Sequence, residues 1–176
     1  MANREALRDL QSRLAQRLQA ARSGDVAASW LGVVCGGANY LFPLSQAGEI
    51  FSWSAAMPVP YAQPWFLGVT NLRGGLYGVV DLAAFLSGVP RPPLEDLAQA
   101  EARLVTFNPA LEINCGLLID RLAGLRHMDA FVSSKAAAPD APACFGTLYT
   151  EGNGVSWQEI NLQTLSRQPQ FLSISA

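Results

Sequence analysis

The sequence predicts a mainly β fold that follows one long helix at the start of the chain. Short runs of β-branched and aromatic residues, separated by turns rich in glycine, asparagine and proline, indicate strands that pair as hairpins. A stripe of leucines at three- and four-residue spacing indicates the helix. The chain has 176 residues, of which 50% are apolar and only 15% are charged. This composition excludes a disordered protein, because a chain of which half the residues are apolar has enough apolar surface to bury.

Candidate hairpins carry the β prediction, and in each of them turn residues separate two apolar runs. Glycine at such a turn supplies the positive φ that a tight connection needs. Strands at this spacing are typical of an all-β barrel or sandwich. In chain order, the runs and their turns are Trp30–Cys35 and Tyr40–Leu44 around Gly36–Asn39, Leu67–Leu72 and Leu76–Leu82 around Gly74–Gly75, Leu104–Phe107 and Ile113–Ile119 around Asn108–Ala110, and Thr147–Thr150 and Val155–Leu162 around Gly152–Gly154.

Residues 2–22 are predicted to form an amphipathic helix that Ser23-Gly24 ends. Arginines occupy the other faces of this helix. Amphipathic helices in proteins draw most of their stability from packing of their apolar face, so the apolar stripe must pack on something. The sequence leaves open whether the stripe packs on the body of the protein itself or on a partner helix. The stripe consists of Leu7, Leu10, Leu14, Leu18 and Ala21.

Other segments are predicted to be connectors. The proline-rich stretch Ser87–Pro93 breaks regular structure, and a short helix is expected over Leu94–Ala102. Ser133–Pro142 is rich in alanine, serine and proline, and we expect a mobile loop there. Val80–Leu82 and Ile160–Leu162 share an apolar-polar-apolar strand ending that precedes a short apolar segment, which suits two related halves.

Two segments of membrane-span length carry no charge, Val26–Gly48 and Ile50–Leu72, each of 23 residues. Their prolines, glycines and amides would be costly in hydrocarbon, so we expect a buried β core instead. The net charge of −2 offers no attraction for a phosphate backbone. Three cysteines fit no secreted disulfide framework, and the first residues carry no apolar signal segment. We therefore expect a cytoplasmic protein that binds no nucleic acid.

Catalytic or metal-binding patterns are sparse. His127 is the only histidine, and no metal, phosphate-binding or nucleophile-elbow motif is present. Cys35 and Cys115 fall in predicted strands, where cysteine acts as a small core residue. Asp81 and Asp120 each follow an apolar strand. Capping of the next turn is the expected role, and a small hydrolase with paired carboxylates is a remote alternative.

Arg73 stands directly before Gly74-Gly75 at a predicted hairpin tip. Its guanidinium suits fork-shaped recognition of a carboxylate or carbonyl on a partner. The alternative is that it closes its own turn or pairs with Glu49 or Asp81. The sequence leaves these two roles equally open.

The chain resembles the CheW-like chemotaxis coupling proteins over about residues 28–165. The signature lies in Pro58–Pro60, in Trp65–Gly74 and in Val79–Leu82. The helix over 2–22 lies outside this resemblance. Together with Leu76–Leu82, that extension is similar to the branch that serves type IV pilus twitching systems, the PilI-like proteins.

The resemblance implies two small SH3-like β-barrels packed side by side in residues 25–176, after a helix within residues 1–24. It implies no catalysis, no cofactor and no metal. The expected partners are the cytoplasmic tip of a methyl-accepting receptor and the regulatory domain of a CheA-type histidine kinase, in membrane-bound receptor arrays. A flagellar-type coupling protein and a standalone receptor-binding modulator remain alternatives. By motif matching, the partner-binding residues are Asn71, Leu72, Arg73 and Gly74, with Val69 and Val80 as apolar support.

Overall fold

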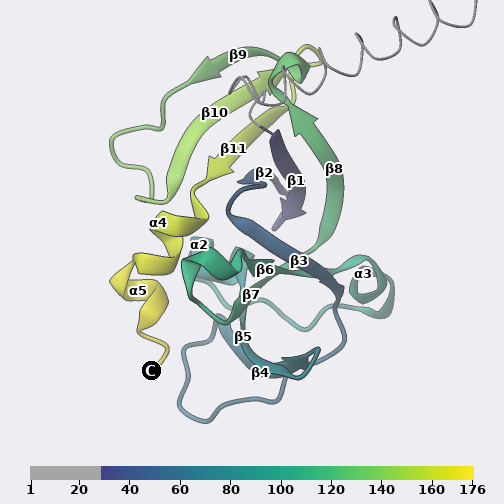
Figure 1. The fold of residues 1–176 in the computed structure, drawn as a ribbon, viewed down its shortest axis with the longest axis vertical. Coiled ribbons are helices and arrows are strands. Elements are labelled where there is room, and N and C mark those ends of the chain that lie inside the picture. The colour runs from purple at the N-terminus through teal and green to yellow at the C-terminus, as the bar shows by residue number, and fades with distance from the viewer. Residues whose placement is uncertain (1–28) are drawn as a thin grey trace, which may run out of the picture.

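The computed structural model describes residues 29–176, which form two β-sheets (Figure 1). The six-stranded sheet has the order β8-β1-β2-β11-β10-β9, and the five-stranded sheet has the order β3-β6-β7-β5-β4. The predicted helix over 2–22 lies outside the described residues. The strands are β1 Ser29–Cys35, β2 Ala38–Pro43, β3 Ala47–Ser52, β4 Phe66–Leu72, β5 Gly75–Asp81, β6 Arg103–Phe107, β7 Cys115–Ile119, β8 Arg121–His127, β9 Phe131–Lys135, β10 Phe145–Glu151 and β11 Ser156–Ile160.

Short helices flank the sheets, and the mainly β prediction is confirmed. The helix expected within Leu94–Ala102 is present as α3. Helices α4 and α5 follow the last strand and lie beside the junction of the two sheets (Figure 1). The helical elements of the described region are α2 Leu82–Ser87, α3 Asp96–Glu101, α4 Leu162–Arg167, α5 Pro169–Leu172 and the 3₁₀ turns η1 Pro109–Leu111 and η2 Met128–Ala130.

Two separate stretches of the chain contribute strands to the six-stranded sheet. It begins there with β1 and β2, builds the five-stranded sheet with β3 to β7, and returns with β8 to β11. Two strand pairs are parallel, β2 with β11 and β5 with β7, and the other neighbouring strands are antiparallel. Strands β2 and β11 are therefore far apart in sequence and paired in the sheet.

Central strands are buried on both faces, which explains the long uncharged segments of the sequence. In β5, Val80 packs into the core shared by both sheets, and Val79 packs into a smaller core of the five-stranded sheet. In β2, Phe42 lies in the shared core and Leu41 in a smaller core of the six-stranded sheet. Since alternate side chains point to opposite faces, two apolar environments require consecutive apolar residues. Within residues 29–176, no helix has the length and apolar character of a membrane crossing.

The two strand endings noted in the sequence have the same geometry. Asp81 ends β5 and caps α2, where its side chain accepts a hydrogen bond from the amide of Ala84. Asn161 follows β11 and caps α4 through the amide of Thr164. The φ and ψ angles are −73° and 104° at Asp81 and −75° and 103° at Asn161. The strand ending that the two halves share in sequence is thus a repeated strand–cap–helix unit.

Two local predictions were wrong. The β4–β5 turn consists of Arg73 and Gly74, because Gly75 already pairs with Leu72 as a strand residue. The expected loop over Ser133–Pro142 begins with a strand, since β9 extends to Lys135 and pairs with β10. Strand β9 is an edge strand, and an edge position tolerates the polar residues that suggested a loop.

Gly68 occupies a position where the backbone of another segment approaches closely. Its φ is 129°, and a Cβ built there would lie 2.0 Å from the carbonyl oxygen of Met57. That contact belongs to a two-hydrogen-bond bridge between Met57 and Val69. Only glycine satisfies both the backbone angle and the space.

We predict that Gly68→Ala lowers the free energy of unfolding by about 2–5 kcal/mol, from backbone strain together with the clash. Gly154→Ala is the matched control, because Gly154 has φ 84° and no atom within 4 Å of the added Cβ. This control should cost only about 1–2 kcal/mol. Urea denaturation measures both, and equal losses for the two variants would contradict the role of the close approach.

Candidate functional site

The β4–β5 hairpin ends in a tight two-residue turn. Arg73 has φ 50° and Gly74 has φ 87°, the pair of positive angles that a type I′ turn requires. The side chain of Asn71 stabilises the turn, because its Oδ1 accepts a 2.9 Å hydrogen bond from the amide of Gly74. The turn therefore fixes the backbone from which the Arg73 side chain projects.

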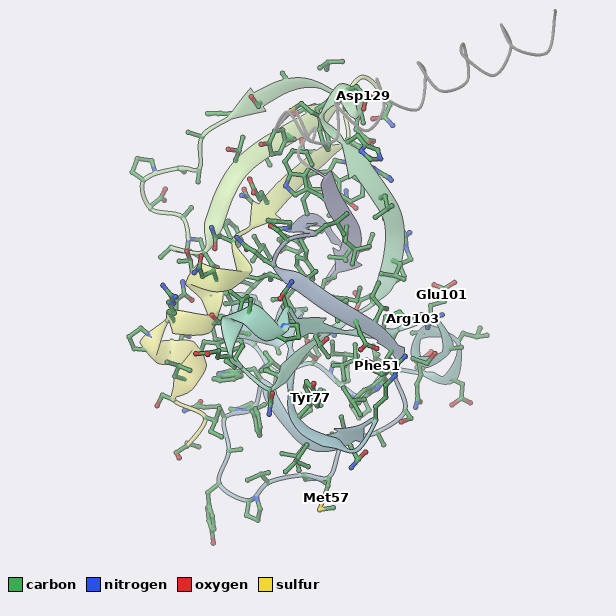
Figure 2. The ribbon with its side chains drawn as sticks, in the orientation of Figure 1. Phe51, Met57, Tyr77, Glu101, Arg103 and Asp129 are labelled. Atoms are coloured by element: carbon green, nitrogen blue, oxygen red, sulfur yellow. The ribbon has the colours of Figure 1, made fainter. Side chains whose placement is uncertain are left out.

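The Arg73 side chain is exposed and paired within the chain. Its Nη1 lies 2.8 Å from Oε2 of Glu49 on β3, with 74% of the arginine side chain and 56% of the glutamate side chain accessible. Its guanidinium lies 5.7 Å from the ring centroid of Phe51, labelled in Figure 2. The predicted alternative of a pair with Glu49 is confirmed. An exposed pair of this kind contributes about 0–1 kcal/mol, so a partner carboxylate can replace Glu49 at small cost.

Other exposed apolar side chains lie on the strands that carry this pair and on the hairpin. Leu76, opposite Asn71 in the β4–β5 register, is 63% exposed, and Ile50 on β3 is 41% exposed. An exposed arginine with apolar neighbours is a composition found at binding hot spots. We call Glu49, Ile50, Asn71, Arg73, Gly74 and Leu76 the hairpin surface.

The other sequence-predicted residues lie deeper. Leu72 is half-buried and packs against the core of the five-stranded sheet. Val69 is half-buried and bridges to Met57 through its backbone. Val80 is 1% exposed within the shared core. These three residues lie beneath the surface, whereas Asn71, Arg73 and Gly74 are exposed.

Asp81 and Asp120 are brought together by Arg91. The Nε of Arg91 lies 2.9 Å from Oδ2 of Asp81, and its Nη1 lies 2.6 Å from Oδ1 of Asp120. The remaining oxygens are also bonded, Oδ1 of Asp81 to the amide of Ala84 and Oδ2 of Asp120 to the amide of Gly36. The expected capping role of Asp81 is confirmed. Each carboxylate oxygen has a partner, so the remote hydrolase alternative loses the free general base it needs.

Arg91 was missed by the sequence analysis, which treated Ser87–Pro93 only as a connector. The available signal was that Arg91 is the one charged residue of that stretch. Burial lowers the pKa of its guanidinium, but the hydrogen bonds to Asp81 and Asp120 outweigh burial and raise that pKa above its usual value. Arg91 is therefore a permanent cation between two carboxylates.

These three residues join the two sheets. Asp81 ends β5 in the five-stranded sheet, and Asp120 lies where the chain crosses from β7 to β8. Asp120 also holds the β1–β2 turn through Gly36. Arg91 attaches the connector after α2 to both points. We call Asp81, Arg91 and Asp120 the junction cluster.

Residues 29–170 match the family described as the CheW-like domain, and both the hairpin surface and the junction cluster fall within the match. The chain belongs to this family.

Three comparisons place this CheW-like chain among known proteins. It is 29% identical to Protein PilI of Pseudomonas aeruginosa over 93% of this chain and 89% of that protein. It is 33% identical to Chemotaxis protein CheW of Rhizobium meliloti over 44% of this chain and 46% of that protein. Its fold is similar to that of the scaffolding protein TtCheW from Thermoanaerobacter tengcongensis, with a TM-score of 0.62, 13% identity, and coverage of 82% of this chain and 96% of that chain. The predicted CheW-like fold is confirmed.

The cysteines of this CheW-like chain are core residues. Cys35, Cys115 and Cys144 are buried and form no disulfide. Burial raises the pKa of Cys35 and of Cys115 to about 12, so both thiols stay protonated near neutral pH and are poor nucleophiles. No group of three or more metal-ligating side chains suited to an ion occurs within the region that the structure describes.

We predict that Arg91→Met lowers the free energy of unfolding of this CheW-like chain by about 2–4 kcal/mol, because it leaves two poorly accessible carboxylates unpaired. Arg73→Met is the matched control, since it breaks an exposed pair and should cost at most about 1 kcal/mol. Denaturation curves give both values, and hydrogen exchange at the Gly36 and Ala84 amides should accelerate in Arg91→Met. Equal stability losses in the two variants would contradict the structural role of the junction cluster.

Proposed function

We propose that this CheW-like chain is a non-enzymatic adaptor that couples methyl-accepting receptors to a CheA-type histidine kinase, in a system controlling type IV pilus twitching. The observation that carries the proposal is the hairpin surface. Arg73 projects from a turn fixed by Asn71, on the motif that the coupling-protein resemblance assigns to receptor binding. A preformed turn loses little conformational entropy when a partner binds.

The chemistry of the buried polar groups favours binding over turnover. Asp81 and Asp120 are occupied by Arg91 and by backbone amides, and the buried thiols of Cys35 and Cys115 are held protonated. Nucleophilic catalysis needs an activated group beside a base. Neither pair of groups supplies that arrangement.

The extent of the similarity favours the pilus branch. The match with Protein PilI covers 93% of this chain, whereas the match with Chemotaxis protein CheW of Rhizobium meliloti covers 44%. We therefore propose a twitching system in preference to a flagellar one, with the protein at receptor arrays on the cytoplasmic side of the membrane.

The mechanism is binding alone. An adaptor that holds receptor and kinase in one geometry lets a small receptor movement change the balance between active and inactive kinase. This requires that the adaptor contact the two states with different free energies. The core shared by both sheets makes the body suited to that role, because packed interiors transmit displacement with little internal deformation.

We predict that Arg73→Glu lowers affinity for the cytoplasmic tip of the receptor, with a loss of about 2–4 kcal/mol, and leaves the protein folded. The substitution replaces the arginine cation with a negative charge, which repels a carboxylate on the partner. Isothermal titration of the variant with the receptor tip measures the loss, and circular dichroism checks the fold.

Arg121→Glu is the matched control, since Arg121 is also an exposed arginine but begins β8 in the other sheet. It should bind the receptor tip like the unmodified protein. Unchanged affinity in folded Arg73→Glu would reject the role of the hairpin surface.

A further inference from the structure

The turn between β10 and β11 carries the only asparagine in the sequence that is followed by glycine. Gly152, Asn153 and Gly154 are all exposed there. Gly154 has φ 84°, and a Cβ built on it would have no described atom within 4 Å. Because glycine has no side chain, its backbone nitrogen is open to approach by the side chain before it. The residues that follow the other asparagines are Arg4, Tyr40, Leu72, Pro109, Cys115 and Leu162.

The side chain of Asn153 is folded back onto the turn. Its Oδ1 accepts a 3.0 Å hydrogen bond from the amide of Val155. This bond closes an Asx turn, a ring of atoms that includes the Gly154 nitrogen. The carboxamide carbon, Cγ of Asn153, is therefore held near that nitrogen.

We infer that Asn153 is a site of spontaneous deamidation, which converts it to aspartate or isoaspartate. The Gly154 nitrogen, once hydroxide has taken its proton, forms a bond to Cγ of Asn153. The Cγ–Nδ2 bond then breaks, Nδ2 leaves as ammonia with a proton from water, and a succinimide ring remains. Water reopens the ring, so the net reaction consumes one water and releases one ammonia. Cleavage of the new Cγ–N bond leaves aspartate, and cleavage of the original peptide C–N bond leaves isoaspartate.

Two hydrogen bonds of the turn act on this reaction in opposite directions. The Val155 amide donates to Oδ1 of Asn153, where negative charge develops as the nitrogen attacks, and a fixed donor stabilises such charge. The Gly154 N–H donates to the carbonyl oxygen of Glu151 at 2.9 Å, and this bond must open first. Exposed turn bonds open at low free energy, since water replaces the lost partner. This second bond therefore slows the reaction without preventing it.

Beside the turn lies a contact that joins distant strands of the six-stranded sheet. Arg126 on β8 places its Nε 2.9 Å from Oε1 of Glu151 on β10. Its guanidinium also lies 4.7 Å from the ring centroid of Trp157. Strands β8 and β10 stand on either side of β1, β2 and β11, so the ion pair spans the sheet (Figure 1). We call Arg126, Glu151 and Trp157 the Arg126 clasp.

Asn153 contacts this clasp through its amide. Its Nδ2 donates to Oε2 of Glu151 across 3.5 Å. Deamidation replaces that donor with a carboxylate oxygen, so two negative charges face each other and destabilise the arrangement in which Glu151 pairs with Arg126. Isoaspartate also adds a methylene to the backbone of the turn, which alters the spacing between β10 and β11. The six-stranded sheet therefore becomes less stable as the chain ages.

Peptide mass spectrometry of the aged full chain tests the site, and it needs neither receptor nor kinase. The protein is incubated in mildly alkaline buffer at physiological temperature and then digested with trypsin. Cleavage after Lys135 and Arg167 releases residues 136–167, which hold Asn153 and Asn161 together. Fragment ions should show progressive replacement of amide by acid at Asn153, with Asn161 unchanged. No replacement at Asn153, or equal replacement at both positions, would overturn the inference.

Gly154→Ala is the control for the reaction. Its methyl group hinders the attacking nitrogen, so conversion of Asn153 should slow severalfold. Circular dichroism checks that the variant stays folded. Conversion at an unchanged rate would exclude attack by the Gly154 nitrogen and overturn the reaction.

The effect on the Arg126 clasp has its own test, which needs no ageing. Asn153→Asp supplies the charge of the product, and Asn153→Ser removes the amide without adding charge. Asn153→Asp should melt about 2–4 °C below Asn153→Ser. In a Glu151→Gln background the two should melt together, because the facing charge is gone. Equal melting temperatures in the unchanged background would overturn the effect on the clasp, and so would a gap that survives Glu151→Gln.

Discussion

The core shared by the two sheets is the constraint on which the other features depend. Strands that lie between two apolar environments need apolar residues at consecutive positions, as in Leu41–Phe42 and Val79–Val80. Phe171 of α5 closes this core against Trp65, Phe85 and Phe107, with ring centroids 5.4–6.3 Å away. Among the described residues, Asp81 is the one buried charged side chain, and it is paired with Arg91 in the junction cluster.

Apolar packing does not by itself fix the orientation of the packed segments. The hydrogen bonds of the junction cluster do fix it. Hydrogen bonds from Arg91 require defined positions of both carboxylates, and each carboxylate also fixes a backbone amide in its own part of the fold. The cluster thereby links the connector after α2, the cap of α2 and the β1–β2 turn. A body that is both packed and oriented can hold two partners at a fixed distance, which is what an adaptor has to do.

Local structure was predictable because local chemistry determines it. Glycines and asparagines mark the hairpins. Asp81 caps α2 because it follows an apolar strand and directly precedes the helix. The β4–β5 turn was displaced by one residue, since an arginine with positive φ is uncommon and Gly74-Gly75 offered an easier turn. Strand β9 was missed because Ser133 and Ser134 are polar, and its position beside β10 depends on Phe131 packing against Trp30 and Tyr149.

Long-range arrangement was not predictable from periodicity. Nothing in the pattern of β2 or β11 indicates that they pair in parallel, and the two-sheet arrangement was expected only from the family resemblance. Likewise, Asp81 and Asp120 were singled out in the sequence but Arg91 was not, and the contact among the three arises only when the fold brings their segments together. Arg73 was singled out because its motif is local, but its pairing with Glu49 required the closure of β3 against the hairpin.

The most direct test of the adaptor account is a mixing experiment followed by size-exclusion chromatography with light scattering. The full chain is combined with the receptor cytoplasmic tip, with the kinase regulatory domain, and with both together. An adaptor should form a complex with each partner and a ternary complex whose mass includes all three proteins. Binding to neither partner, or binding to only one of them at a time, would contradict it.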